Sequence, residues 1–192
     1  MPAARPQVDY GLPLVSGNLP RGEGNMFHIH GLVPELWCSS FDESLHFYTE
    51  VLGFSVTQRR DSDYHAYLEL GDAQLMLAHW EQDGTWEPAA LEKPYGRGVN
   101  FFILVEDVRA IYDSVLAAGV EPFVALHTTW YWRTDRMDES TEFGVLDPDG
   151  YLLRFSQVES CRPVEQSDLD ALDRKHASLL DCIAKGKNHP SD

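Results

Sequence analysis

Apolar residues recur at helical spacing in two stretches of the chain, and runs typical of β-strands surround each stretch. The first helix is predicted to open at Phe41, with acidic residues in its first turn, and to end at Gly53. The second is predicted to begin at Glu106 and to end at Gly119. Strands are predicted at 32–38, 54–59, 64–70, 74–80, 99–105, 120–126 and 151–157, with less regular ones at 128–132 and 141–146.

The order of one strand, one helix and further strands occurs twice, so segment 42–54 has its counterpart in segment 107–120. An internal duplication of this kind is a strong architectural signal. It predicts an α+β fold in which two βαβββ modules form a curved mixed sheet around a concave cleft. The predicted organisation is an N-terminal arm over residues 1–31, the paired modules over 32–158 and a C-terminal tail over 159–192.

The tail is predicted to contain an amphipathic helix that begins at Ser167, has aspartates in its first turn and is followed by Gly186. Its apolar residues fall on one stripe: Leu169, Leu172, Leu179, Leu180 and Ile183. We expect this stripe to dock on the body of the protein or on a second subunit.

The chain carries a formal net charge of −16, which argues against nucleic acid as a partner because phosphate binding needs a basic surface. No apolar run approaches the roughly 18 residues that span a membrane, and no signal peptide is visible. The three cysteines form no CxxC pair, so reduced thiols are the simplest interpretation. A cytoplasmic protein that contacts neither nucleic acid nor a membrane is expected.

The segment Asp147–Tyr151 reads Asp-Pro-Asp-Gly-Tyr, which combines a proline, a glycine and aspartates that favour a tight turn before a strand. This turn, the helix segment 44–54 and the duplication together resemble the vicinal oxygen chelate superfamily. That superfamily contains glyoxalase I, extradiol dioxygenases, and fosfomycin and bleomycin resistance proteins. The likeness covers residues 32–158 and is greatest to the bleomycin resistance group. It implies paired βαβββ modules and a homodimer whose binding cleft lies partly across the subunit interface.

Metal-using relatives hold one divalent ion with four His, Glu or Gln side chains on the concave sheet. The resemblance places Val33, Leu77, Asn100 and Arg154 at these four positions. Aliphatic groups donate no lone pair, and a guanidinium is a fixed cation that repels a metal ion. Neither a metal nor another cofactor is therefore expected. His28 with His30, and Glu69 with His79, are spaced as possible ligands, but a structural role is the preferred interpretation.

Strand alternation and the resemblance together place a set of side chains on the concave face. These candidates for ligand binding are Glu35, Trp37, His79, Asn100, Phe102 and Arg154. For Arg154 a salt bridge to Glu35 and ligand recognition are both open. Three adjacent aromatics on one strand cannot all be buried on the same face, so Trp130 and Trp132 are further candidates, with packing at a dimer interface as the alternative.

Apolar walls with a few polar groups are typical of small-molecule pockets. The sequence therefore predicts a metal-free binding protein that resembles bleomycin resistance proteins and sequesters a flat aromatic or cationic ligand in a dimer cleft. The alternative is a lyase, isomerase or dioxygenase of the same superfamily with a rearranged metal site. A metal-independent enzyme with His79 or Glu35 as general base also stays open. So does a dimer whose tail helix recruits a partner.

Overall fold

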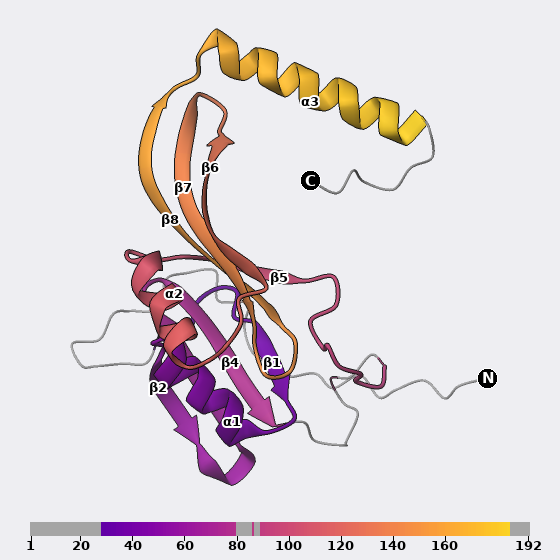
Figure 1. Cartoon of the computed structure of the whole chain (residues 1–192). Helices are drawn as coiled ribbons and strands as arrows, with labels where there is room; N and C mark the ends of the chain where they lie inside the picture. The colour runs from indigo at the N-terminus through magenta and orange to yellow at the C-terminus, as the bar shows by residue number, and fades with distance from the viewer. Residues whose placement is uncertain (1–27, 80–85, 87–88, 185–192) are drawn as a thin grey trace, which may run out of the picture.

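The computed structural model describes residues 28–79, 86 and 89–184, so the predicted arm over residues 1–31 lies almost entirely outside the described part. Within that part the protein contains two four-stranded sheets, three α-helices and short helical turns (Figure 1). The predicted α+β class with a C-terminal helix is confirmed. No described helix is long and apolar enough to cross a membrane.

The first module has strand order β1-β4-β3-β2, with β1 and β4 parallel and the other neighbours antiparallel. After β1, the helix α1 continues into one π-helical turn over Phe47–Val51, and Gly53 follows. The elements of this module are β1 (Glu35–Cys38), α1 (Phe41–His46), β2 (Ser55–Arg60), β3 (His65–Leu70) and β4 (Ala73–His79).

The second module repeats this arrangement with strand order β5-β8-β7-β6, and β5 and β8 are its parallel pair. The matching orders confirm the duplication predicted from the sequence. The elements are β5 (Asn100–Leu104), α2 (Val108–Ala117), β6 (Val124–Trp132), β7 (Arg136–Leu146) and β8 (Leu152–Pro163), and α3 (Gln166–Ala184) follows them.

The strands of the second module differ from the predicted ones. The strands predicted at 120–126 and 128–132 are wrong as separate elements, because the chain forms the single strand β6 with a bulge between Val124 and His127. The segment that joins them contains no glycine or proline, so no turn interrupts it. β7 begins at Arg136 instead of 141, and β8 continues to Pro163, beyond the predicted domain end at 158.

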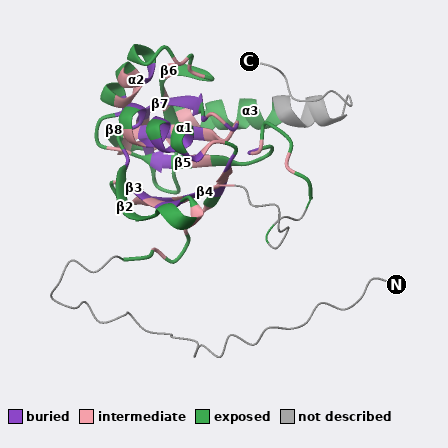
Figure 2. Ribbon diagram, turned by 90° about the horizontal axis from the view of Figure 1, so that it is seen from below, coloured by how far each residue is buried: buried purple, intermediate pink, exposed green. Residues whose placement is uncertain are grey.

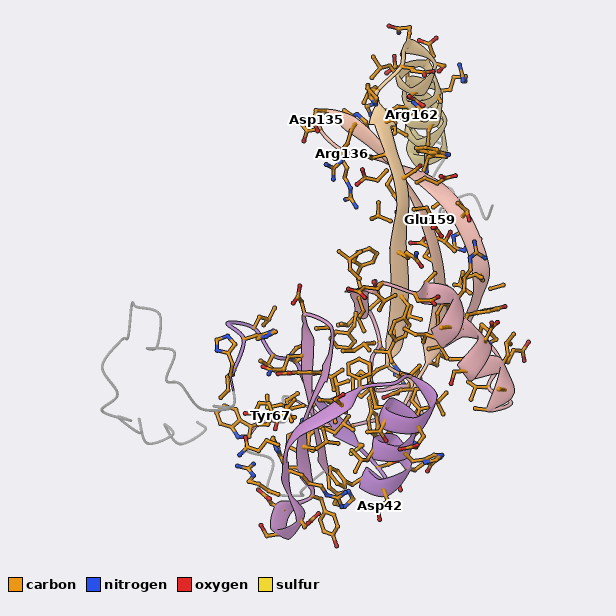
Figure 3. All side chains as sticks on the ribbon, turned by 90° about the vertical axis from the view of Figure 1, so that its left-hand side faces the viewer. Asp42, Tyr67, Asp135, Arg136, Glu159 and Arg162 are labelled. Carbon is orange, nitrogen blue, oxygen red and sulfur yellow. The ribbon has the colours of Figure 1, made fainter. Side chains whose placement is uncertain are left out.

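The strands β6, β7 and β8 extend beyond the body of the protein, and α3 lies across their distal end (Figure 1). Figure 3 shows Arg136 and Arg162 at this distal end, far from Tyr67 in the first module. Arg162 joins the sheet to the helix, because its guanidinium lies 4.8 Å from the Trp130 ring centroid and its Nη1 lies 2.7 Å from Asp168 Oδ2. Leu169 and Leu172 of α3 are each 39% exposed, so the described part of its apolar stripe is not covered by the body.

The core lies between the sheets and the helices α1 and α2 (Figure 2). Tyr48 of the π-helical turn is fully buried, and its ring meets Phe54 edge to face. On α2, Val108 and Val115 face the second sheet and are also fully buried. Within the described residues, α1 and α2 pack against one face of each sheet and no helix covers the other face (Figure 1), so alternate side chains of a strand enter the core or face away from it.

The helix-free face of the first sheet meets the end of the N-terminal arm. Gln74 of β4 accepts a hydrogen bond from His30 N and donates one to the carbonyl of His28. Its Nε2 also lies 2.6 Å from Glu69 Oε1 on the adjacent strand. One side-chain amide thus satisfies two backbone groups of the arm and holds it on the sheet.

The Asp-Pro-Asp-Gly turn between β7 and β8 connects the two modules. The Asp149 side chain is fully buried and accepts hydrogen bonds from Ser39 N and Ser44 Oγ, both at the start of α1. Lys93 Nζ lies 2.8 Å from its Oδ1. Burial alone would raise the pKa of Asp149, but Lys93 and Ser39 outweigh this and hold the pKa below its usual value.

Asp147 shapes the same turn from inside. Its Oδ1 accepts hydrogen bonds from the backbone N–H groups of Asp149 and Tyr151, and its Oδ2 accepts one from the Tyr48 hydroxyl. Burial raises the pKa of Asp147 to about 6. Gly150 has φ +88°, and a Cβ at this position would lie 2.3 Å from Pro94, so the turn requires glycine here.

The raised pKa of Asp147 predicts a specific pH dependence. Between its usual pKa of 3.8 and about 6, folded Asp147 holds a proton that the unfolded chain has released, so its contribution to stability falls as pH rises. Asp147→Asn cannot ionise and keeps the acceptor for both backbone N–H groups. Relative to the wild type, this variant should gain about 2 kcal/mol of unfolding free energy between about pH 4 and pH 7, measured by urea denaturation.

Asp149→Asn is the matched control, because its pKa shift has the opposite sign. This variant should be less stable than the wild type at neutral pH, and the deficit should shrink as the pH falls. Equal and pH-independent effects of the two substitutions would contradict this account of the turn.

Candidate functional site

Three adjacent strands of the second module bring polar side chains together on the helix-free face of the sheet. In the strand register, Glu142 of β7 stands opposite His127 of β6 and Ser156 of β8. Arg154 of β8 stands opposite Phe102 of β5 and Gly144 of β7. Residues directly opposite each other share a face, so these side chains gather at one place although they are far apart in the sequence.

The centre of this place is an ion pair between Arg154 and Glu142. Arg154 Nη2 lies 2.9 Å from Oε1 and 2.7 Å from Oε2, and Arg154 Nε lies 3.2 Å from Oε2. The Glu142 side chain is only 5% exposed, whereas the Arg154 side chain is 35% exposed. The carboxylate is therefore the buried partner, and the guanidinium extends toward the open side.

Tyr131 completes the pair. Its hydroxyl donates to Glu142 Oε1 at 2.5 Å and accepts a hydrogen bond from Arg154 Nη2. The pKa of Tyr131 is raised, first by burial and then by its hydrogen bond to the anionic Glu142. The phenol thus stays neutral and acts as donor and acceptor at once.

Two further groups surround the ion pair. His127 Nε2 lies 3.4 Å from Glu142 Oε1, and its Nδ1 lies 3.0 Å from the carbonyl oxygen of Ala125. The Arg154 guanidinium lies 5.0 Å from the Phe102 ring centroid and 5.6 Å from that of Tyr131. Aromatic rings stabilise a cation at such distances by about 0.5–1 kcal/mol at exposed sites. The guanidinium is therefore held by both hydrogen bonds and rings.

A groove of about 400 Å³ opens over this cluster. We call it the β6–β8 groove. This volume is within the range of small-molecule sites. It is lined by Asn100, Val124, His127, Glu142, Phe143, Gly144, Leu152 and Arg154.

The structure places the predicted site residues unequally. Asn100 and Arg154 line the β6–β8 groove, and Phe102 lies against the Arg154 guanidinium. Glu35 lies instead near His65, with 3.5 Å between Oε1 and Nε2. The salt bridge considered between Glu35 and Arg154 is wrong, because Arg154 pairs with Glu142. Trp37 is half-buried on the same face of β1 as Glu35, and no described hydrogen bond or ion pair connects it to the groove.

His79 does not share a face with Glu35 and Trp37, so the predicted arrangement of β4 is wrong. In the parallel register His79 stands opposite Cys38, whose side chain belongs to the helix-covered core. The His79 ring packs against Tyr64 with 5.8 Å between centroids, beside Ser39 and Asp42 in a separate hollow of about 330 Å³. One position of register separates the two faces, and the sequence did not fix that register.

Trp130 and Trp132 lie on the opposite face of β6 from Tyr131, because side chains alternate along a strand. They are 39% and 50% exposed. The three aromatics are therefore divided between the faces, as expected, but the middle residue is the one that reaches the Arg154 cluster. Stacking of a groove ligand on Trp130 or Trp132 is not supported by this placement.

Sequence reasoning did not select Tyr131, Glu142 or His127 as site residues. Tyr131 follows from side-chain alternation once the odd-numbered residues of β6 are known to point toward the groove. Glu142 stands on β7, which is only weakly predicted as a strand. Its pairing with Arg154 depends on the register between β7 and β8, for which no single sequence pattern is diagnostic.

The four positions that the resemblance assigns to metal ligands do not fit a metal ion. Leu77 is fully buried in the core, Val33 is aliphatic, and Arg154 carries a positive charge that is already paired with Glu142. Among the described residues, no three His, Cys, Asp or Glu side chains gather in a way that could hold a metal ion. The residues at these four positions therefore do not form a metal-binding site.

Comparison with known proteins gives consistent results at the level of family. A family model described as the Glyoxalase/Bleomycin resistance protein/Dioxygenase superfamily matches residues 27–155. A solved superfamily member from Vibrio splendidus 12B01 is 35% identical, with 66% of this chain and 96% of that chain covered and a TM-score of 0.31. No curated protein matches the chain.

Two more distant structures share the fold. A protein of unknown function from Agrobacterium tumefaciens str. C58 is 19% identical, with 69% of this chain and 96% of that chain covered and a TM-score of 0.53. TioX from Micromonospora sp. ML1 is 23% identical, with 66% and 97% covered and a TM-score of 0.50.

The unequal burial of the ion pair predicts unequal costs of breaking it. Arg154→Met leaves the buried Glu142 without its cation and should lower the unfolding free energy by about 2 kcal/mol or more. Glu142→Gln leaves an arginine that reaches solvent and should cost about 1 kcal/mol. The double variant, which removes both charges, should recover part of the loss caused by Arg154→Met.

Urea denaturation of the three variants and the wild type measures this double-mutant cycle. Equal costs for the two single variants, or strictly additive costs in the double variant, would show that the pair is not coupled as described.

Proposed function

The chain belongs to the Glyoxalase/Bleomycin resistance protein/Dioxygenase superfamily, and we propose that within it this protein is a metal-free small-molecule binding protein. It would sequester a flat ligand in the β6–β8 groove without changing it chemically, in the manner of the bleomycin resistance proteins that it resembles. A superfamily fold hosts several chemistries, so the proposal depends on this site and not on the fold.

One feature carries the proposal: the resemblance assigns Arg154 to a position at which metal-using relatives place a metal ligand, and in this chain that side chain is a guanidinium. Arg154 is held there by Glu142 and Tyr131 and is flanked by the Phe102 ring. A fixed positive charge at this point disfavours a divalent cation, whereas an arginine held by other side chains is a good recognition group for a polar substituent of an organic molecule. These features support binding of an organic ligand at this site.

The walls of the groove suit the flat part of such a ligand. Val124 and Leu152 supply apolar surface, and Gly144 between them carries no side chain. Phe102 at the edge is 46% exposed, so its ring can stack on a planar group as well as on Arg154. A few polar groups within apolar walls are the usual composition of a small-molecule site.

We extend the proposal to a homodimer in which a second copy closes the groove. Support comes from β5, an edge strand of its sheet that pairs only with β8 among the described strands. Its side chains Phe102 and Leu104 are 46% and 59% exposed. Large apolar side chains on an unpaired edge are a liability in a monomer and are usually covered by a partner.

Titration of the purified protein with flat aromatic compounds tests the proposed function. We expect saturable binding, detected by tryptophan fluorescence or calorimetry, and an unchanged ligand mass after prolonged incubation. Gly144→Val places a branched side chain between Val124 and Leu152 and should weaken binding at least tenfold, because it fills the groove.

Elemental analysis of the same preparation separates this proposal from metal-dependent enzymology. We expect far less than one transition-metal ion per chain. Stoichiometric nickel, zinc, iron or manganese, or conversion of a ligand into a product of different mass, would overturn the binding function.

A further inference from the structure

We propose, building on the binding function above, that the β6–β8 groove selects an electrically neutral flat molecule that carries a carbonyl-type acceptor, such as an aromatic amide or lactam. The sequence left aromatic and cationic ligands equally open. The hydrogen bonds around Glu142 and Arg154 distinguish between them.

Glu142 supplies a carboxylate to the lining of the groove, and a cationic ligand would need such a group free to pair with it. Its Oε1 accepts from Tyr131 and Arg154 and also lies near His127, and its Oε2 accepts twice from Arg154. A carboxylate oxygen has two lone pairs. Both oxygens are therefore occupied, and the side chain is 5% exposed. An ammonium ligand finds no free anion here.

Some N–H donors of the groove have no partner in the described part of the chain. Arg154 uses Nε and Nη2 for its partners, and its Nη1, with two N–H groups, makes no hydrogen bond within the described part of the chain. The side-chain amide of Asn100, which also lines the groove, has no hydrogen bond to a described residue and supplies two N–H donors and one carbonyl acceptor. The free capacity of the groove is thus mainly that of a donor, which suits a ligand with an acceptor.

The net charge of the groove and of the whole chain disfavours an anionic ligand. Arg154 and Glu142 form a neutral pair, and the chain as a whole carries a formal net charge of −16. A carboxylate ligand would leave the occupied groove with a net negative charge inside a negatively charged protein. A neutral carbonyl accepts from Arg154 Nη1 without this penalty. Acceptor ligands are therefore divided by charge, and the neutral ones are favoured.

Shape sets the remaining condition. A Cβ at Gly144 would lie 3.4 Å from Val124 and 3.5 Å from Leu152, so this part of the groove is a narrow slot between two apolar side chains. A planar ring fits such a slot, and the Phe102 ring beside Arg154 extends the flat surface. Gly144 and Arg154 are register neighbours on adjacent strands, so an acceptor attached close to the ring suits this arrangement.

Three probes that share the naphthalene ring system test this inference on the full-length protein: 2-naphthamide, 2-naphthoate and 2-naphthylmethylammonium. Dissociation constants are measured at neutral pH by calorimetry or ligand-observed NMR. We expect the amide to bind at least tenfold more tightly than the carboxylate and the ammonium. Tighter binding of the ammonium or of the carboxylate would overturn the inference.

Two variants locate the effect. In the double variant Arg154→Met with Glu142→Gln, the guanidinium and the carboxylate are removed together, and the preference for 2-naphthamide over 2-naphthoate and 2-naphthylmethylammonium should disappear. Trp132→Phe, on the opposite face of β6, is the matched control and should leave every dissociation constant unchanged. A preference that survives in the double variant would also overturn the inference.

These experiments distinguish a failure of the proposed ligand class from a failure of the proposed binding function. If the probes bind, and Gly144→Val weakens all of them, but the ammonium or the carboxylate binds most tightly, the binding function stands and the ligand class is wrong. If no probe binds, or if Gly144→Val has no effect, the proposed function itself fails.

Discussion

Two buried carboxylates in one tight turn hold the molecule together. Asp149 joins the end of the β7–β8 connection to the start of α1 and to Lys93, and Asp147 joins it to Tyr48 in the core of the first module. A buried charge is tolerated only where hydrogen bonds or an opposite charge compensate its loss of hydration. These contacts fix the position of the turn relative to α1 and the core of the first module, and they thereby fix the start of β8. Arg154 lies five residues after Asp149, so the position of the groove follows from the position of the turn.

The same alternation that builds each sheet also decides which residues can act together. In the second module the helix-covered face contains Phe143 and Phe155, stacked at 5.3 Å, while the free face contains Glu142 and Arg154. Neighbours in the chain thus have unrelated tasks, one in the core and the next in the groove. Because both tasks depend on a single register between β7 and β8, the packing of the core also fixes the geometry of the ion pair.

The sequence predicted the fold well and the site in part. Duplicated helical spacing and glycine ends are local signals, so both modules, their helices and the Asp-Pro-Asp-Gly turn could be identified. The resemblance predicted which residues of β5 and β8 share a face, so Asn100 and Arg154, which line the groove, and Phe102, which lies against Arg154, were identified. His79 was placed on the wrong face, because the parity of β4 depends on its pairing with β1. Glu142 could not be identified, since it is twelve positions from Arg154 in the sequence and only the register between β7 and β8 brings the two side chains together.

The two modules have the same strand order, yet their helix-free faces are used differently. In the first, Gln74 binds the backbone of the arm at His28 and His30, and Glu35 lies beside His65. In the second, the corresponding surface stays open over Arg154. When a module is duplicated within one chain, the helix-free face of one copy can bind a segment of the chain itself. The same face of the other copy is then free to evolve toward ligand binding. Sequence drift in the first copy would then be limited by folding, and drift in the second, under the proposed function, by ligand binding.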